Sequence, residues 1–584
     1  MNQDVEPKIK TRIVKQKQKN GDIYILERKT QYDPVKKYNR VLSSRLVSKI
    51  PKGKDESVPT RPKRRNGEKV GNSSPGVQVI EATRTRIGMM DILEHIGNES
   101  GIDKALLSFA DQGTAQKIIS LARYLVGTNG QSFPGISVWQ YAHPLPYKDG
   151  ITEDIYHKLF EKIGRDEQLQ QNFFLSRSQS VSDKPVLAYD STTISTDSEN
   201  LLEARYGFNK ASDGKKTIKL LTLYSIDTMQ PIAFTKQPGN LSDVVTVENA
   251  LKQMDILGLG KAEIITDNGY YSESNLSEML YAHFDFITLV KTSVKWIKSE
   301  IDAHHDDLET TFSVCPFDTA THGITIMKKH TFKHSRKYAS SAKNMAAGSH
   351  EEFNRRIYIH IYSNPFRRVE QENELNASLF EIKAHIESGK AIEELSDNAI
   401  KKIEQFMHVH YYAGKPIVSF NEAAIAERKK YHGYFVLISS SEKDTFTCLS
   451  KYRRRGLIES FFESEKQRPD GNRPREWSSD VLRGRMFVQF VALCYFEYFH
   501  QKIVRLKSEL GKPDGIPEHD CATNIAMEEK LKSWLCNTPL YLVLQWFDVI
   551  ESVSISTQLK NKRWNTETTL RDKMFLEKIG MRES

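Results

Sequence analysis

The sequence predicts an α/β protein in which a mixed β-sheet is covered by helices and interrupted by an insertion. Two observations predict this fold. Residues 185–293 alternate apolar, strand-like runs with amphipathic helical stretches, and the first three strand-like runs are consecutive. Residues 296–450 break this alternation, and two further helical stretches follow them. Short strands that alternate with helices are typical of a sheet with helices packed on its faces.

Composition excludes several classes of protein. The 584 residues are 39% hydrophobic and 27% charged, as in a soluble protein of several domains. No apolar run reaches the roughly 18 residues of a membrane span, and the charged N-terminus does not resemble a secretory signal. Five cysteines without a CxxC pair argue against a disulfide scaffold and a cysteine zinc site. We therefore expect a cytoplasmic protein.

Basic residues are concentrated at the N-terminus. Residues 1–70 contain 20 Lys and Arg against 8 Asp and Glu, a net charge of +12, whereas the whole chain carries +9. Such a basic segment indicates attraction to a phosphate backbone, although a solvated tail is the alternative. Alternating residues predict strands over 23–32 and 36–50, and a Pro, Gly and Ser-rich linker follows at 51–76. Residues 1–80 are thus expected to form a DNA-binding module and its linker.

The remaining elements follow in order along the chain. A helical region is expected over 81–180, where Ile118, Leu121, Ala122 and Leu125 share one helix face. We expect the first part of the core over 181–295, with five strands (185–196, 216–227, 231–240, 261–272 and 285–293) and helices at 242–258 and 272–284. A mainly β insertion is expected over 296–450, although a charged helical stretch lies within it. The second part of the core spans 451–510, with helices at 452–466 and 480–506, and a C-terminal region (511–584) is a possible dimerisation element.

Two aspartates follow apolar strands. Asp190 comes after Leu187-Ala188-Tyr189 and Asp267 after Ile264-Ile265-Thr266, and we expect a polar turn after each. Functional residues of open sheets gather at strand ends, so the two side chains are expected to converge. An aspartate after a strand is, however, also a common turn former.

The helix expected over 452–466 carries a more specific pattern. At ~100° per residue, Tyr452, Arg455, Glu459 and Lys466 fall within an arc of roughly 60°, opposite the apolar Leu457, Ile458 and Phe461. A solvated charged face is the simple alternative. Gly456, which weakens the helix, suggests tight packing at this point.

Three carboxylates brought together repel one another unless a cation lies between them. Oxygen-only ligands suit Mg²⁺ or Mn²⁺, and two such ions can activate an attacking hydroxyl and stabilise the leaving oxygen of a phosphodiester. Arg455, Lys466 and Tyr452 would then hold phosphates.

These residues resemble a known family. The spacing Y-x2-R-x3-E-x6-K from Tyr452 to Lys466 is similar to the signature of bacterial insertion-sequence DDE transposases, whose RNase H-like catalytic core is interrupted by a mainly β insertion. The resemblance also covers DSTTIS at Asp190, YGFNK, PGNLSD and DNGYYSESNL at Asp267, across roughly residues 185–500. The 192 residues from Asp267 to Glu459 leave room for the insertion.

The resemblance implies roles for individual residues. Asp190, Asp267 and Glu459 would be the catalytic and metal-binding triad, holding two Mg²⁺ or Mn²⁺ ions, and Tyr452, Arg455 and Lys466 would grip the DNA. Relatives cut through a hairpin and stack a flipped base on an aromatic residue, for which this chain offers Tyr434 or Phe435. Many relatives have a tryptophan there, so the hairpin route is less firmly implied than the triad.

The sequence therefore predicts a cut-and-paste transposase of the bacterial cytoplasm, associated with the nucleoid when bound to DNA. It would cleave the ends of its insertion sequence and join them to target DNA as a homodimer on double-stranded DNA, without a membrane partner. Two alternatives stay open: a catalytically silent transposase-derived DNA-binding protein, and an RNase H-like two-metal nuclease without strand transfer.

Overall fold

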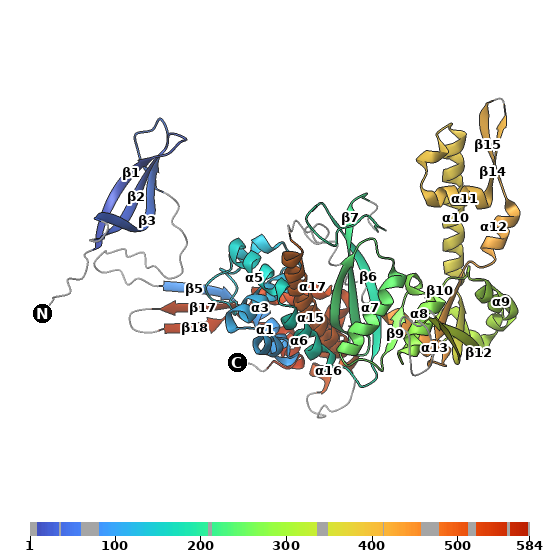
Figure 1. Cartoon of the computed structure of the whole chain (residues 1–584). Helices are drawn as coiled ribbons and strands as arrows, with labels where there is room; N and C mark the ends of the chain where they lie inside the picture. Colours follow the sequence, from blue (N-terminus) through green and yellow to red (C-terminus); the bar gives the residue numbers. More distant parts are fainter. Residues whose placement is uncertain are drawn as a thin grey trace. The chain divides into compact units, whose positions relative to one another are not determined.

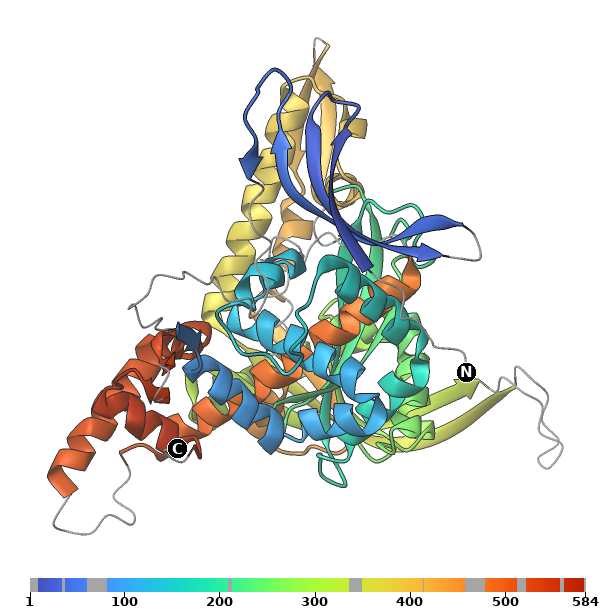
Figure 2. The same cartoon turned by 90° about the vertical axis from the view of Figure 1, so that its left-hand side faces the viewer.

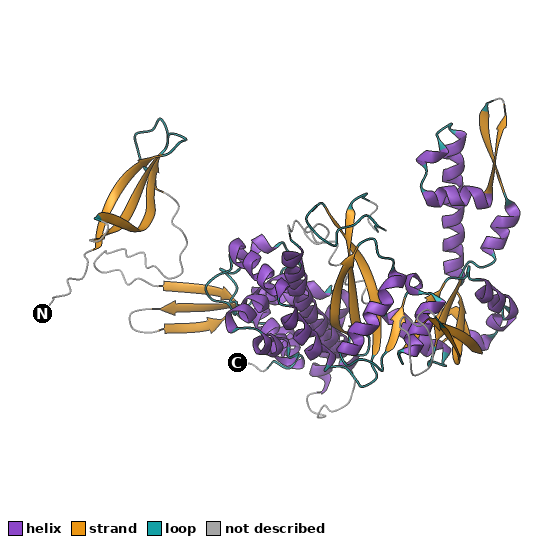
Figure 3. Cartoon of the chain, in the orientation of Figure 1, coloured by secondary structure: helices purple, strands orange, loops and turns teal. Residues whose placement is uncertain are grey.

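A computed structural model describes residues 9–33, 37–59, 81–207, 209, 213–335, 349–412, 414–456, 478–511, 521–556 and 561–581. The chain divides into two compact units, Met1–Ile80 and Glu81–Ser584. The first unit contains only strands among its described residues, and the second contains strands and helices (Figure 3). The two units are described separately below.

The first unit is a four-stranded antiparallel sheet. Its strands are β1 Ile9–Lys17, β2 Ile23–Asp33, β3 Tyr38–Ile50 and β4 Val58–Pro59, in this order across the sheet. The two strands predicted on either side of the YDP turn are β2 and β3. Of the side chains described in this unit, none is buried, so the sheet has no hydrophobic core within its described part.

The second unit begins with one strand and a group of helices, as predicted. These elements are β5 Glu81–Arg86, α1 Gly88–Glu99, α2 Ile102–Phe109, α3 Gln112–Gly127, η1 Phe133–Gly135, α4 Ile136–Trp139, α5 Glu153–Arg165 and α6 Glu167–Ser178. Helices α3 and α5 pack against the long helix α15 Ser479–Glu509, drawn in orange behind the blue and cyan helices of Figure 2. Gly164 and Gly484 allow this contact, because a Cβ on Gly164 would lie 1.8 Å from the carbonyl oxygen of Asp480.

The centre of the unit is a nine-stranded mixed sheet in the order β11-β12-β13-β16-β10-β9-β6-β7-β8. Its core strands and helices are β6 Val186–Thr196, β7 Lys216–Ser225, β8 Gln230–Pro238, α7 Asp243–Ile256, β9 Glu263–Thr266, η2 Asn268–Tyr270, α8 Glu273–Tyr281 and β10 Asp285–Val290. Strands β6, β7 and β8 form an antiparallel meander, and β9 and β10 add in parallel next to β6. This arrangement confirms the predicted mixed sheet of an RNase H-like core (Figure 1).

Helices cover both faces of the core strands. On one face the Tyr189 hydroxyl donates to the carbonyl oxygen of Thr246 in α7. On the other face the Tyr224 hydroxyl donates to Glu497 of α15 at 2.9 Å, and Phe234 packs on Phe490 of the same helix. The aromatic run around Phe487–Phe499 is therefore core, as predicted.

The insertion differs from the prediction. It contains α9 Lys295–Ala303, η3 Asp306–Glu309, η4 Thr311–Ser313, β11 Val314–Cys315, β12 Asp318–Ser335, β13 His350–Ser363, α10 Pro365–Glu387, η6 Ile392–Glu394, α11 Asp397–Phe406, β14 Met407–Tyr412, β15 Lys415–Phe420, α12 Glu422–Lys429 and β16 Tyr434–Ser439. A mainly β insertion is thus wrong, because helices α9 to α12 contribute as much as the strands. Salt bridges at i,i+4 spacing, such as Arg368–Glu372 and Lys383–Glu387, support α10.

The insertion is also not one separate body. Strands β11, β12, β13 and β16 continue the core sheet, with β16 paired antiparallel to β10. Helices α10 to α12 and the hairpin β14–β15 have a hydrophobic cluster of their own, formed by residues such as Leu379, Phe406 and Val418.

The chain ends with a mixed C-terminal region. Its elements after α15 are α16 Cys521–Asn537, α17 Leu540–Trp546, η7 Phe547–Val549, β17 Glu551–Ser556, β18 Asn561–Asn565 and α18 Leu570–Lys578. Strand β17 pairs with both β18 and β5, so the C-terminal region closes onto the start of the unit. None of the helices in the described ranges is long and apolar enough to cross a membrane.

Candidate active site

The pairing of two parallel strands brings the two predicted aspartates together. In the ladder between β6 and β9, Val186 lies opposite Glu263 and Ala188 opposite Ile265. The same register, continued by two residues, places Asp190 beside Asp267. Neighbouring strands lie about 4.8 Å apart, and in-register residues point to the same face of a sheet. The two carboxylates therefore share one face.

The strand expected over 185–196 is confirmed, so the turn also expected directly after Asp190 is wrong, whereas the turn after Asp267 is present. Strand β6 continues through Asp190 to Thr196 because it pairs with β7 along this whole length, with Asp190 opposite Thr222. Asp267 follows the last residue of β9, and its carboxylate accepts a hydrogen bond from the backbone N–H of Asn268 at 2.7 Å.

A guanidinium group connects the two carboxylates. Arg455 Nη1 donates to Asp190 Oδ2 at 3.0 Å, and Arg455 Nη2 lies 3.8 Å from Asp267 Oδ2. The side chains of Arg455 and Asp190 are only 8% and 9% exposed, so this ion pair is largely shielded from water. The Tyr452 hydroxyl donates to Asp267 Oδ1 at 3.1 Å. Both residues thus face the aspartates, on the side of the helix that the predicted stripe requires.

Helix α13 Thr445–Arg454 carries Tyr452 and ends just before Arg455. It begins seven residues earlier than the helix predicted over 452–466. Glu459 and Lys466 lie outside the described residues, so the rest of the predicted stripe has no described position. Within the described ranges, no three His, Cys, Asp or Glu side chains are close enough together to hold a metal ion.

A polar network that the sequence interpretation missed supports this site from below. Asp243, the first residue of α7, accepts hydrogen bonds from Ser191 Oγ at 2.8 Å and from Lys219 Nζ at 2.7 Å. Gly269 allows this approach, since a Cβ there would lie 3.1 Å from Asp243 Oδ2. The PGNLSD motif could have predicted this network. Its aspartate begins a helix beside the strand that carries Asp190, where it can accept hydrogen bonds from neighbouring side chains.

Burial and nearby carboxylates keep Tyr270 protonated. Burial raises the pKa of its hydroxyl well above the usual value, and the negative charges of Asp190 and Asp243 raise the pKa further. The ring of Tyr189 packs against that of Tyr270 in a tilted arrangement, with ring centroids 5.2 Å apart, and the pKa of Tyr189 is raised for the same reasons. The two tyrosines beneath the aspartates are therefore uncharged.

A second missed contact attaches α13 to the sheet. Lys451 Nζ lies 2.7 Å from Glu263 Oε2 and 2.9 Å from Glu442 Oε2. Burial lowers the pKa of Lys451, but the hydrogen bonds that its ammonium donates to the two carboxylates outweigh burial and raise the pKa overall. Because Glu263 begins β9 and Lys451 precedes Tyr452, this ion pair orients the helix relative to the strand that leads to Asp267.

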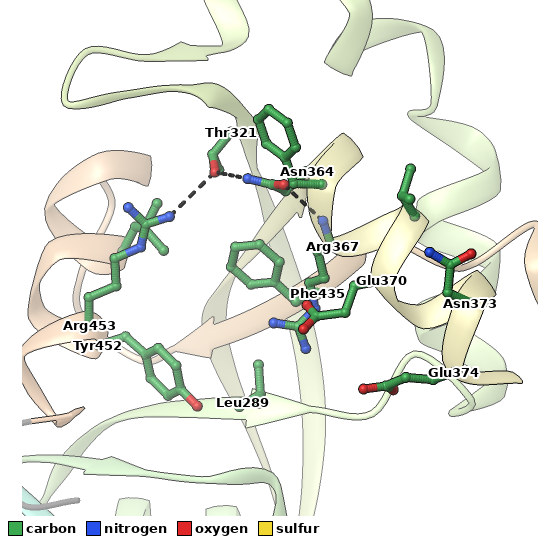
Figure 4. A pocket seen from close by; sticks show the side chains of 13 residues that line it. Leu289, Thr321, Asn364, Arg367, Glu370, Asn373, Glu374, Phe435, Tyr452 and Arg453 are labelled. Carbon is green, nitrogen blue, oxygen red and sulfur yellow. Dashed lines mark hydrogen bonds between the residues drawn. The ribbon is translucent and has the colours of Figure 1, made fainter. Parts of the chain in front are cut away.

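A groove of about 1140 Å³ adjoins the site, between α13 and the start of α10 (Figure 4). Phe435 and Tyr452 line it, together with Arg367 and Arg453. One face of the Phe435 ring stacks on Tyr362 at 4.8 Å, and the guanidinium of Arg367 lies 5.3 Å from its centroid. Tyr434 does not line this groove, and its hydroxyl is hydrogen-bonded to His305 at 2.5 Å. The structure thus separates the two predicted aromatics, because successive residues of a strand point to opposite faces.

Comparisons with known proteins found a family and a solved structure that match the chain. A family model described as a transposase DDE domain matches residues 181–495. None of the curated proteins compared with the chain matches it. One solved structure, a piggyBac transposase synaptic complex with hairpin DNA, is 11% identical over 79% of this chain and 78% of that chain, with a TM-score of 0.33. The family match spans more than half of the chain and includes Asp190, Asp267, Tyr452 and Arg455, so the chain belongs to the DDE transposase family, whose members cut DNA with the help of divalent metal ions.

Proposed function

We propose that this chain is a cut-and-paste transposase that binds the ends of its own insertion sequence, cleaves them and joins the freed 3′-OH ends to target DNA. The observation that carries the proposal is the site on one sheet face, where Asp190 and Asp267 lie in register and Arg455 and Tyr452 bind them. A group of aligned carboxylates, cations and a tyrosine hydroxyl suits the cleavage of a phosphodiester better than it suits a purely structural role.

The residues present fit a divalent metal centre formed by Asp190, Asp267 and Glu459. Their donors are carboxylate oxygens, which Mg²⁺ and Mn²⁺ prefer. The guanidinium of Arg455 lies against both described carboxylates, which supports a place for positive charge between them. Two bound ions would supply the activation of the attacking hydroxyl and the stabilisation of the leaving oxygen.

Tyr452, Arg455 and Lys466 are assigned to the DNA backbone beside the cleaved bond. Arg455 is bound to Asp190 and Asp267, so its guanidinium must exchange a carboxylate for a phosphate when DNA and metal bind. Arginine suits this exchange because its planar fork matches both groups.

The groove next to Tyr452 is assigned to a flipped base on the hairpin route. Phe435 offers the aromatic surface, and its ring is stacked on Tyr362. Arg367 lies over the Phe435 ring and must move aside or stack on the base itself, as arginine side chains do in nucleic-acid complexes. Tyr434 is the weaker choice because it lies outside the groove.

The first unit is assigned to recognition of the transposon ends, because residues 1–70 carry the basic excess of the chain. A homodimer that pairs two ends is the expected assembly, with the C-terminal region as the dimerisation element, in a bacterial cell and on its nucleoid.

Cleavage of a labelled duplex taken from the DNA that flanks the gene tests the proposal. In Mg²⁺ or Mn²⁺ the protein should cut at the element end, and Asp267→Asn and Glu459→Gln should each lower the rate by about 1,000-fold, because metal ligands contribute several kcal/mol to the transition state. The matched control is Asp255→Asn, an exposed aspartate at the end of α7, which should cut normally. Binding without any cut would leave a DNA-binding protein, and cutting without joining would leave a nuclease.

A further inference from the structure

Helix α13 covers one face of the β12–β13 ribbon at Thr325, but from Met327 to Ser335 this face is bare and only the opposite face is covered. Phe332 and His334 are buried on the covered face, where the imidazole of His334 stacks on Tyr281 of α8 at 3.8 Å. Met327, Lys329, Thr331 and Lys333 alternate with them and are exposed on the other face. Strand alternation therefore gives the ribbon a polar, positively charged outer surface.

Two cations lie directly opposite each other on this bare face. Lys329 is the cross-strand partner of Arg356, and both side chains are exposed. Neither has an ion-pair partner among the described residues. Like charges directly opposite each other in a sheet are destabilising. Four residues further on, Lys333 and Glu352 occupy the same type of position and form an ion pair at 3.0 Å. An acidic residue opposite Lys329 would have neutralised it, as Glu352 neutralises Lys333.

The bare face is also the face of the candidate active site. Cross-strand partners on this face lead from β12 to β10. Thr325 of β12 lies opposite His360 of β13, which lies opposite Leu437 of β16, and Leu437 lies opposite Leu289 of β10. The parallel register of β9 and β10, continued by one residue, sets Leu289 beside Asp267. Lys329 is four residues beyond Thr325, so it points to the same side as Asp267.

The distance between Asp267 and Lys329 allows a single DNA duplex to contact both. Four residues along the strand correspond to about 13 Å, and four strand spacings across the sheet correspond to about 19 Å, which combine to about 23 Å. This distance equals about seven base pairs at 3.4 Å each.

We propose that Lys329 and Arg356 bind the phosphate backbone of the transposon-end duplex at a second contact, about seven base pairs from the cleaved bond. The inference rests on the proposed function and adds a binding surface to it. A duplex backbone supplies the closely spaced negative charges that relieve the repulsion between the two cations. A two-stranded ribbon also has the width to follow a major groove.

The test compares two double variants for binding to the labelled end duplex at several salt concentrations. Lys329→Gln with Arg356→Gln removes two positive charges and should weaken binding about tenfold or more, with the salt slope reduced by about 1.8. The control, Lys333→Gln with Glu352→Gln, removes two charges from the same ribbon without changing its net charge, so affinity and slope should stay as in wild type. The Lys329/Arg356 variant should melt no lower than wild type, because it removes the repulsion between two like charges. The control should melt close to wild type, because an exposed ion pair contributes little to stability.

A second arm uses a duplex that ends about four base pairs beyond the cleavage site, too short to reach the ribbon. Wild type and the Lys329/Arg356 variant should bind this short duplex equally. Equal affinity and equal salt slope on the long duplex would overturn the ribbon surface. Wild-type cleavage in Mn²⁺ is measured in parallel: if the protein does not cut but the variant binds the long duplex weakly, the proposed function fails while the ribbon surface stands.

Discussion

The positive charge of Arg455 lies next to the two aspartates of the site in the absence of any ligand. Asp190 is almost fully buried and has the guanidinium as a neighbour at 3.0 Å, while Asp267 lies 3.8 Å from the same group. Two carboxylates on one sheet face repel each other unless a cation lies between them. The guanidinium thus offsets this repulsion and holds the site together, but it competes with metal ions for the same oxygens.

At the residue scale this competition predicts a rescue by metal. Arg455→Gln should lower the free energy of unfolding by about 3–5 kcal/mol in the absence of metal, because it leaves a buried carboxylate without its partner. Mn²⁺ should restore most of this loss, and thermal unfolding with and without Mn²⁺ measures it. Arg454→Gln, a neighbouring exposed arginine, serves as the control and should melt like wild type. The same deficit with and without Mn²⁺ would mean that Arg455 has a structural role alone.

At the scale of elements, the position of α13 depends on how closely it approaches the sheet. A Cβ on Gly323 would lie 2.6 Å from the Tyr362 ring and 2.9 Å from Thr445 Cγ2, so only glycine permits this approach. His360 lies in the same interface, fully buried, with its Nδ1 hydrogen-bonded to Thr325 Oγ1 at 2.7 Å. Burial lowers the pKa of His360 from 6.5 to about 4.

This interface predicts a loss of stability in mild acid. The folded-state pKa of His360 lies below the unfolded value, so its contribution is complete above about pH 6.5 and is lost as the pH falls towards 4. A difference of this size corresponds to about 3 kcal/mol. Urea unfolding between pH 7 and 4 should show this slope, and His360→Asn should flatten it. The exposed His408→Asn should leave the slope unchanged; an equal slope in wild type and His360→Asn would contradict the assignment.

At the scale of the whole molecule, stability and charge are divided between the two units. The hydrophobic clusters lie in residues 81–584. The described side chains of the first unit are all at least partly exposed, and residues 1–70 carry a net charge of +12. Removal of residues 1–80 should therefore leave the melting temperature of the remainder unchanged and should weaken binding to the end duplex, with a shallower salt slope. Calorimetry and a salt titration check the two halves of this prediction. An unchanged slope would remove the first unit from DNA recognition.

Local patterns in the sequence determined the order of strands and helices in the core, the two aspartates, and the common helix face of Tyr452 and Arg455. Each depends on periodicity or on residues a few positions apart, which short-range geometry controls. The strand expected over 185–196 and the helical stretch expected within the insertion are both present. The turn expected after Asp190 is absent, because pairing with β7 continues the strand through it, and the insertion contains more helix than the expected mainly β structure.

Only the tertiary structure decided which groups meet. The partners of Arg455, the support of Asp243 by Lys219, and the attachment of Lys451 to Glu263 join residues that are 265, 24 and 188 positions apart. The fusion of the insertion strands with the core sheet likewise depends on the pairing of β10 with β16. Strand register and buried ion pairs form between segments that are distant in the sequence, so no local pattern predicts them. The candidate site forms because the packed sheet brings these distant residues to one face.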